Sequence, residues 1–245
     1  MAKIVTFISG KGGSGKSTVL VGIANELALS GKRILIADTD TGLNCMDVIS
    51  GVGEGAVFNW GDIFNGSCEV ADAIYPSLNI ENLFILPAPK EYNKDFCPTI
   101  LKDLLRLISD NFDFILIDAP AGLGQNLTLA LEPADEAVLV VNDDVFSLKA
   151  GKKAADIAES MEKSTTLIIN AFRAFAVKNG LLPSVDEAMD ITEIGLLGIV
   201  PFEANLNFNA SQGLPYLRDT RATNAFLRIA KRLQGEKIDL PEQWR

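Results

Sequence analysis

The sequence predicts an α/β fold in which a doubly wound, mostly parallel sheet is flanked by helices. Short runs of β-branched and apolar residues alternate with segments of helical periodicity along the 245 residues. With 48% hydrophobic and 22% charged residues, the chain can bury a sizeable core. Because no repeat, low-complexity stretch or Pro/Gly/Ser linker interrupts it, we expect residues 1–245 to form one domain, with 235–245 as a short C-terminal tail.

Seven runs have the composition of strands, and each is short and rich in Val, Ile, Leu or Phe. Helical segments separate most of them, so we expect parallel pairing, which needs a crossover between consecutive strands. The expected strands are residues 4–8, 33–37, 82–86, 114–117, 137–141, 166–169 and 196–200.

The first helix is expected at residues 16–30, directly after the first strand. Val19, Leu20, Ile23 and Leu27 fall at helical spacing, and Gly31 occupies the position of a C-terminal cap. Residues 42–80, rich in Gly, Asn and Asp, should form short helices and loops. Further helices are expected at roughly 99–109, 147–161 and 222–234.

The composition excludes several classes of function. The 32 Asp and Glu residues outnumber the 22 Lys and Arg, giving a net charge of −10, so nucleic acid is an unlikely partner. The chain has no histidine, which excludes Ser-His-Asp and Cys-His nucleophilic sites and His-ligated zinc. Any catalysis must therefore use Lys, carboxylates, hydroxyls or a bound metal.

The cysteine pattern and the apolar runs indicate a cytoplasmic location. Cys45, Cys68 and Cys97 lie far apart, form no C-x-x-C pair and are odd in number, which argues against a disulfide framework. The start of the chain lacks the features of a secretory signal. The longest purely apolar runs are about five residues, against the roughly 20 that span a bilayer.

A glycine-rich phosphate-binding motif follows the first expected strand. Residues 10–18 read GKGGSGKST, which fits G-x-x-x-x-G-K-[ST]. The glycines leave backbone N–H groups free for phosphate oxygens, and the helix N-terminus adds about half a positive charge. Lys16 is expected to reach the terminal phosphates and the Ser17 hydroxyl to ligate Mg²⁺. The alternative is a flexible glycine turn that happens to carry a lysine.

The same stretch also satisfies the dinucleotide-binding pattern G-x-G-x-x-G, through Gly10, Gly12 and Gly15. Asp38 lies at about the distance of a ribose-binding acid, so an oxidoreductase is a rival class. Lys16 and Ser17 are superfluous for a pyrophosphate but required for a triphosphate. The chain also lacks a histidine and a Tyr-x-x-x-Lys pair, so the phosphate-loop interpretation is favoured.

Three acidic residues follow expected strands. Asp118 ends the run at 114–117, as a metal-facing carboxylate on a buried strand does, although an Asp that caps the next turn is the alternative. Asp38 and Asp40 flank Thr39 after the strand at 33–37, so alternation places both on one side. There, one can support the metal and the other can position water; solvated turn acids are the alternative.

The second lysine of the loop, Lys11, makes the motif resemble the deviant Walker A signature of the MinD/ParA family of P-loop ATPases. Further blocks look like the MinD type in order, although the lysine motif also fits partition ATPases, nitrogenase iron proteins and metal-insertion ATPases. These blocks are residues 38–43 (DTDTGL), 82–88 (NLFILPA), 118–122 (DAPAG), 134–137 (ADEA), 198–201 (GIVP) and 210–215 (ASQGLP).

The resemblance implies a Mg²⁺-dependent ATPase that dimerises around ATP and positions other proteins, plausibly at the division site. Lys11 would reach the partner's nucleotide, unless it is an idle solvated lysine, and Asp40 would position the attacking water. The metal site would comprise Ser17, Asp38 and Asp118. The ATP-binding set would be Gly12, Gly13, Ser14, Gly15, Lys16, Ser17 and Thr18 at the phosphates, with Asn170, Pro201 and Glu203 near adenine.

Some features depart from the family or leave alternatives open. Asn170 could also be an ordinary turn residue, and Asn44 replaces the usual Arg. Lys149, Lys152 and Lys153 stand where partner-binding members often carry acidic residues, so the effector or cargo is unidentified. These lysines form either an altered effector face or a solvated helix face, and the solvated face is favoured. A partition ATPase, a metal-insertion ATPase and a scaffold that binds ATP without hydrolysing it are the alternatives.

The end of the chain gives little support for membrane binding. The apolar side of the helix at 222–234 is expected to pack, and the tail alternates in charge sign and offers only Trp244 as an interfacial anchor. We therefore expect weak or absent autonomous membrane binding.

Overall fold

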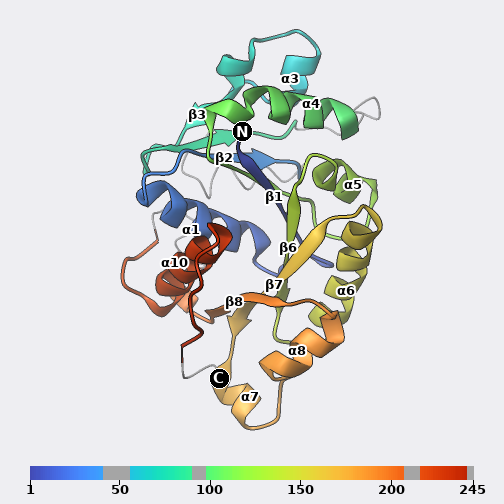
Figure 1. Ribbon diagram of the computed structural model, residues 1–245, viewed down its shortest axis with the longest axis vertical. Coiled ribbons are helices and arrows are strands. Elements are labelled where there is room, and N and C mark those ends of the chain that lie inside the picture. The colour runs from blue at the N-terminus through green and yellow to red at the C-terminus, as the bar shows by residue number, and fades with distance from the viewer. Residues whose placement is uncertain (41–55, 90–97, 207–215, 242–245) are drawn as a thin grey trace.

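The computed structural model describes residues 1–40, 56–89, 98–206 and 216–241. In this part of the chain an eight-stranded sheet runs in the order β3-β4-β2-β5-β1-β6-β7-β8 (Figure 1). All neighbours pair in parallel except β3 and β4, which are antiparallel. The strands are β1 (Lys3–Ile8), β2 (Ile34–Asp38), β3 (Tyr75–Pro76), β4 (Leu83–Leu86), β5 (Phe114–Asp118), β6 (Glu136–Asn142), β7 (Ser164–Phe172) and β8 (Leu196–Pro201).

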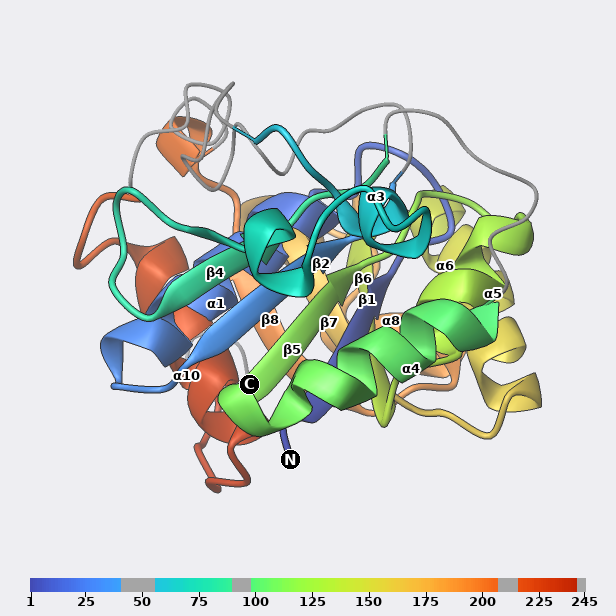
Figure 2. The same cartoon turned by 90° about the horizontal axis from the view of Figure 1, so that it is seen from above.

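Helices cover both faces of the sheet, as expected (Figure 2). One face packs against α1 (Lys16–Leu29) and α10 (Arg221–Leu233). The other packs against α4 (Pro98–Ile108), α5 (Gln125–Leu131), α6 (Val145–Ser160) and α8 (Val185–Thr192). The remaining short elements are α3 (Trp60–Phe64), η2 (Val70–Ala73), η3 (Ser109–Asn111) and α7 (Ala174–Lys178).

Side chains alternate in direction along each buried strand and so contribute to the cores on both faces of the sheet. In β1, Ile4 and Ile8 belong to the cluster under α4, α5 and α6, whereas Val5 and Phe7 belong to the cluster under α1 and α10. Successive strand side chains point to opposite faces, so a strand buried on both faces reads as a continuous apolar run. This explains why all seven expected strands are confirmed.

The longer helices also match the expectation. Helix α1 begins after Gly15 and ends at Leu29, followed by the capping residue Ser30, and Gly31 has a φ of +87°, which confirms its predicted place at the helix end. Helix α6 begins two residues earlier than expected because the Asp144 side chain accepts a hydrogen bond from the Ser147 N–H and caps it. The described part of 42–80 contains only short helices, loops and β3; residues 42–55 lie outside the description.

The tail continues from α10 along the edge strand β8. The Arg232 guanidinium donates from Nε (3.0 Å) and Nη2 (2.6 Å) to the Ile238 carbonyl, and also contacts the Leu197 carbonyl. Leu240 packs against the core on the face of the sheet that α4, α5, α6 and α8 cover. No described helix combines the length and the apolarity that crossing a bilayer requires.

Candidate functional site

The loop between β1 and α1 lies at the carboxyl edge of the sheet, where open α/β sheets bind ligands. It encloses a cavity of about 250 Å³. Besides Ser9 and Ala121, the cavity is lined by residues that the sequence singled out: Lys11, Gly12, Gly13, Ser14, Gly15, Lys16, Ser17, Thr18, Asp38, Asp40 and Asp118. The structure thus brings together the phosphate loop and all three expected carboxylates.

Lys16, Ser17 and Asp118 form the centre of the site. The buried Lys16 ammonium makes an ion pair with Asp118 Oδ1, and Ser17 Oγ donates to Asp118 Oδ2 at 2.6 Å. Asp118 ends β5, directly opposite Asp38 at the end of β2 in the strand register. One carboxylate therefore holds both side chains that the motif assigns to phosphate and metal.

Asp38 and Asp40 complete the acidic side of the cavity. Asp38 is 1% exposed. Its burial is the main cause, and the nearby Asp118 carboxylate the second, that raises the pKa of Asp38 well above its usual value of 3.8. Its Oδ1 accepts a hydrogen bond from the Asp40 N–H at 2.8 Å. Burial raises the pKa of Asp40 as well, against the opposing effect of Lys16.

The donor set fits Mg²⁺ bound together with a nucleotide. Within the described ranges, no cluster of three or more His, Cys, Asp or Glu side chains could hold a metal by itself. Mg²⁺ usually takes one or two carboxylates, several waters and substrate phosphates, so a hydroxyl and two carboxylates suffice. Asp38 and Asp118 are both buried and are register partners at the ends of adjacent strands, so a bound cation would relieve the repulsion between their carboxylates.

Two side chains that the sequence analysis missed fix the acidic strand ends. Trp60 Nε1 donates to the Asp38 carbonyl at 2.9 Å, and Thr39 Oγ1 donates to the Asp118 carbonyl at 2.8 Å. Thr39 lies between two residues that were singled out, so its position carried a signal. Trp60 carried none, because it reaches the site from a separate short helix.

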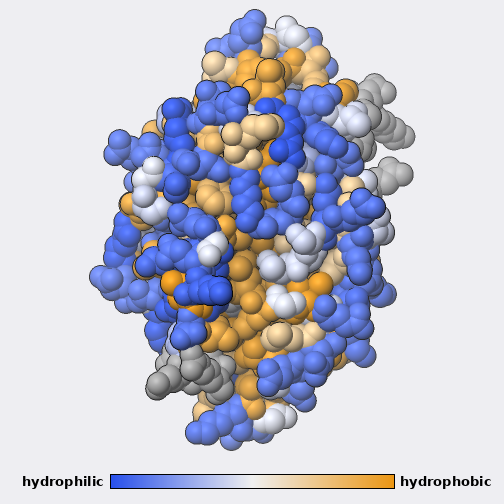
Figure 3. Space-filling view, in the orientation of Figure 1, coloured by the Kyte–Doolittle hydropathy of each residue, from blue (hydrophilic) through white to orange (hydrophobic). Residues whose placement is uncertain are grey.

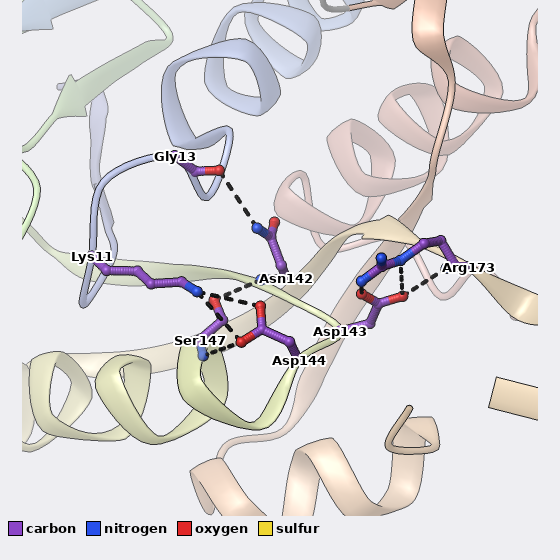
Figure 4. Close-up of polar contacts among 7 residues, drawn as sticks. All are labelled: Lys11, Gly13, Asn142, Asp143, Asp144, Ser147 and Arg173. Atoms are coloured by element: carbon purple, nitrogen blue, oxygen red, sulfur yellow. Dashed lines mark hydrogen bonds and ion pairs between the residues drawn. The ribbon is translucent and has the colours of Figure 1, made fainter. Parts of the chain in front are cut away.

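Lys11 has an acidic partner within its own chain. Its Nζ lies 3.3 Å from Asp144 Oδ2, and Asp144 also caps α6 (Figure 4). The Lys11 side chain remains 39% exposed at the mouth of the cavity. Sequence analysis missed Asp144, although the polar run Asn142, Asp143 and Asp144 follows an expected strand as Asp118 does.

The three residues expected near adenine have different surroundings in this structure. Asn170 contacts the loop, since its Nδ2 donates to the Ser14 carbonyl at 2.8 Å. Neither Pro201, at the end of β8, nor Glu203 lines the cavity. Glu203 Oε1 instead accepts a hydrogen bond from the Ala222 N–H (3.1 Å) and lies 3.8 Å from Arg221 at the start of α10.

Several expected residues lie outside this site or outside the description. Cys68 is a free, half-buried thiol that packs against the core. Asn44, Cys45, Cys97, the block at 210–215 and Trp244 fall outside the described residues.

A larger cavity, of about 940 Å³, lies between α7, α8 and the tail, away from the phosphate loop. Figure 3 shows apolar side chains gathered on this face between α10 and α8. Its lining combines apolar side chains such as Phe172, Val185 and Met189 with polar ones such as Lys178 and Asp186, but contains no residue of the phosphate-loop motif. We therefore assign the chemistry to the phosphate loop despite its smaller volume.

The chain is similar to known proteins over most of its length. A family profile described as "AAA domain" matches residues 2–170. The septum site-determining protein MinD of Helicobacter pylori is 32% identical, over 99% of this chain and 94% of its own. MinD of Bacillus subtilis is 30% identical, over 98% and 92%.

Solved structures give the same result. The chain matches a MinC:MinD cell division protein complex of Aquifex aeolicus with a TM-score of 0.91 and 32% identity, covering 98% of this chain and 99% of that one. It matches Pyrococcus horikoshii MinD complexed with Mg-ADP with a TM-score of 0.85 and 26% identity, covering 95% and 96%.

The fold and the loop define a P-loop ATPase of the MinD/ParA type. The chain belongs to the MinD family. The dinucleotide-binding oxidoreductase that the glycine spacing left open is not favoured.

Proposed function

We propose that the chain is a Mg²⁺-dependent ATP hydrolase that dimerises around ATP and positions a partner protein in the cytoplasm, with division-site placement as its role. The observation that carries this proposal is the buried cluster of Lys16, Ser17 and Asp118 beside Asp38, inside the loop cavity. The support for the division role is the set of relatives named septum site-determining proteins.

In this proposal, the chain's own groups divide the work of phosphoryl transfer, which is largely positioning and charge stabilisation. Lys16 leaves Asp118 for the terminal phosphates, and the Asp118 carboxylate and the Ser17 hydroxyl would then hold the cation. Bound Mg²⁺ supplies charge neutralisation at the phosphates. Asp38 supports that cation, and the half-exposed Asp40 orients the attacking water.

Lys11 would contact different groups before and after the chain dimerises. Here it pairs with Asp144 of its own chain, and both side chains are partly exposed, so this pair is weak. Contact with a nucleotide held by a second copy requires Lys11 to leave Asp144. A cation supplied by another chain to the transition state is worth roughly 10³ to 10⁵ in rate in related phosphoryl transfer.

The partner is proposed only as a protein effector or cargo. The Aquifex relative is seen in a complex with MinC, which makes a division protein the first candidate. The lysines on α6 are not all available to a partner, since Lys152 pairs with Asp156 and Glu193 at 2.8 Å each. The solved partition proteins are only 18% identical, so they support the shared fold alone.

The test is the oligomeric state of the wild type, Asp40→Ala and Lys11→Ala with Mg-ATP or Mg-ADP, measured by size exclusion with light scattering. We expect Asp40→Ala to accumulate as a dimer with ATP and to stay monomeric with ADP, because only the water step is removed. Lys11→Ala should bind nucleotide but neither dimerise nor hydrolyse it. Equal steady-state turnover by Asp40→Ala and the wild type, or wild-type dimerisation and turnover by Lys11→Ala, would contradict the assigned roles.

A further inference from the structure

Two asparagines contact backbone carbonyls of the phosphate loop through their side-chain amides. We propose that Asn142 and Asn170 are positioning residues that orient the peptides between Gly13 and Gly15, so that their N–H groups face the phosphates. This inference rests on the proposed function, since it concerns how the same loop binds a phosphate chain.

The two asparagines lie side by side at the ends of adjacent strands. Asn142 of β6 is the register partner of Asn170 of β7, and neighbouring strands lie about 4.8 Å apart. Asn142 Nδ2 approaches the Gly13 carbonyl at 3.5 Å (Figure 4). Asn170 Nδ2 donates to the Ser14 carbonyl at 2.8 Å. Two consecutive loop carbonyls are therefore bound by two consecutive strands.

Fixing these carbonyls also fixes the N–H groups of the loop. In a trans peptide, the carbonyl and the following N–H point in opposite directions. When the Gly13 and Ser14 carbonyls face the asparagines, the N–H groups of Ser14 and Gly15 point away from them. Such N–H groups bind phosphate oxygens in loops of this type. The asparagines thus prearrange two N–H groups that donate hydrogen bonds to phosphate oxygens.

The loop needs this support because its backbone is permissive. Gly13 and Gly15 have φ values of +79° and +78°, a region that glycine enters freely. Asn170 also fits tightly, since a Cβ at Gly15 would lie 2.2 Å from its Nδ2. The loop can approach Asn170 this closely only with glycine at position 15.

The asparagines are themselves held in place. The ladder between β7 and β8 shifts register between Ile169 and Phe172, and Ala171 has a φ of +52°. Directly after this irregular end of β7, Arg173 donates to the buried Asp143 from its N–H (2.8 Å), Nε (3.3 Å) and Nη2 (2.6 Å). Because Asp143 follows Asn142 directly, this contact ties the strand ends that carry both asparagines.

The proposal separates loop positioning from base recognition. If Asn170 acts on the loop, its loss weakens every phosphate ligand, with or without a base. If it reads adenine, its loss changes the preference between bases and leaves pyrophosphate binding intact.

The experiment titrates Mg-ADP, Mg-GDP and Mg-pyrophosphate into the wild type, Asn170→Ala and Asn142→Ala by calorimetry. The control is Asn224→Ala, at an exposed position of α10. We expect Asn170→Ala to weaken ADP and pyrophosphate by the same factor, about fivefold to tenfold, because a buried carbonyl loses its donor. Asn142→Ala, with its longer contact, should weaken both by about twofold to threefold. The ratio of ADP to GDP affinity should change by less than about twofold.

Unchanged pyrophosphate affinity in Asn170→Ala, with ADP weakened and the preference over GDP lost, would overturn the proposal in favour of adenine reading. Wild-type affinities in both variants, or a wild type that binds ADP without measurable affinity for pyrophosphate, would also overturn it. If circular dichroism shows that Asn170→Ala is unfolded, Asn170→Leu, similar in shape but without a donor, is judged by the same criteria. A folded wild type that binds none of the three ligands would instead contradict the proposed function.

Discussion

Asp38 and Asp118 place two carboxyl groups side by side in a region that solvent hardly reaches. Their exposed fractions are 1% and 3%, and Lys16 forms its ion pair with Asp118. Burial disfavours the charged form of a carboxyl group, and a second carboxylate nearby disfavours it further. The arrangement therefore costs stability in the free protein and becomes favourable when a cation and phosphates arrive.

Substitution of Asp38 by Asn is expected to stabilise the metal-free, nucleotide-free protein at neutral pH. The pKa of Asp38 is raised in the folded state, so its stabilising contribution is complete below the unfolded value near 3.8 and is lost as the pH rises toward the raised folded value. Asn keeps the oxygen that accepts the Asp40 N–H, and it has no charge to bury.

Melting curves between pH 5 and 8, recorded with a chelator, check this expectation. The melting temperature of Asp38→Asn should exceed that of the wild type by at least about 2 °C at pH 8, with a smaller gap at pH 5. The same variant should lose Mg²⁺-dependent ATP turnover. A variant that is less stable than the wild type, or a gap that does not depend on pH, would contradict the assignment.

Among single residues, sequence alone could identify those with a local signature. The loop residues follow a spaced motif, and Asp118 stands at the end of an apolar run. Asn142 and Asp144 were missed because their roles depend on contacts with residues more than 120 positions away, although their place after a strand was visible. Trp60 could not be predicted, since its indole donates to a carbonyl on another element.

At the scale of elements, prediction succeeded where burial imposes a pattern over many residues. The seven longer strands consist mainly of buried apolar residues, and α1 and α10 carry helical spacing. Strand β3 was missed because it has only two residues, one of them Pro76, at the edge of the sheet. Helices α5, α7 and α8 were missed because five to eight residues give too few turns for a clear period.

The contact between α1 and α10 makes a test at this scale. A Cβ at Gly22 would lie 2.4 Å from the Phe226 ring, which is fully buried. Gly22→Ala gains up to about 1 kcal/mol in helix propensity, but overpacking costs about 1–3 kcal/mol.

We expect Gly22→Ala to melt at a lower temperature than the wild type, by about 2–4 °C for each kcal/mol of net loss. Gly195→Ala is the matched control, because a Cβ at the exposed Gly195 meets no atom within 4 Å. A Gly22→Ala protein that melts at or above the control temperature would show that the two helices separate at little cost.

On the scale of the whole molecule, net charge and the packing of the C-terminal region argue against membrane attachment by this chain alone. The net charge of −10 opposes an anionic lipid surface. In α10, Phe226, Ile229, Ala230 and Leu233 are buried, as the sequence analysis expected, so its apolar side is not available to lipid.

We expect no strong binding to anionic vesicles, with or without Mg-ATP, in a co-sedimentation assay. A vesicle without anionic lipid serves as the control for trapping. Robust ATP-dependent co-sedimentation that is lost on deleting residues 236–245 would refute this and establish a membrane-cycling protein.

The central claim, that this loop binds Mg-ATP, is tested most directly by calorimetric titration of Mg-ATP into the wild type and Lys16→Ala. Lys149→Ala, at an exposed lysine of α6, is the control, and circular dichroism verifies that each variant is folded. The account predicts saturable binding by the wild type and the control, and a loss of about tenfold to 100-fold in affinity for Lys16→Ala, because a charge-assisted contact to the phosphates is removed. Unchanged affinity in a folded Lys16→Ala protein would contradict it.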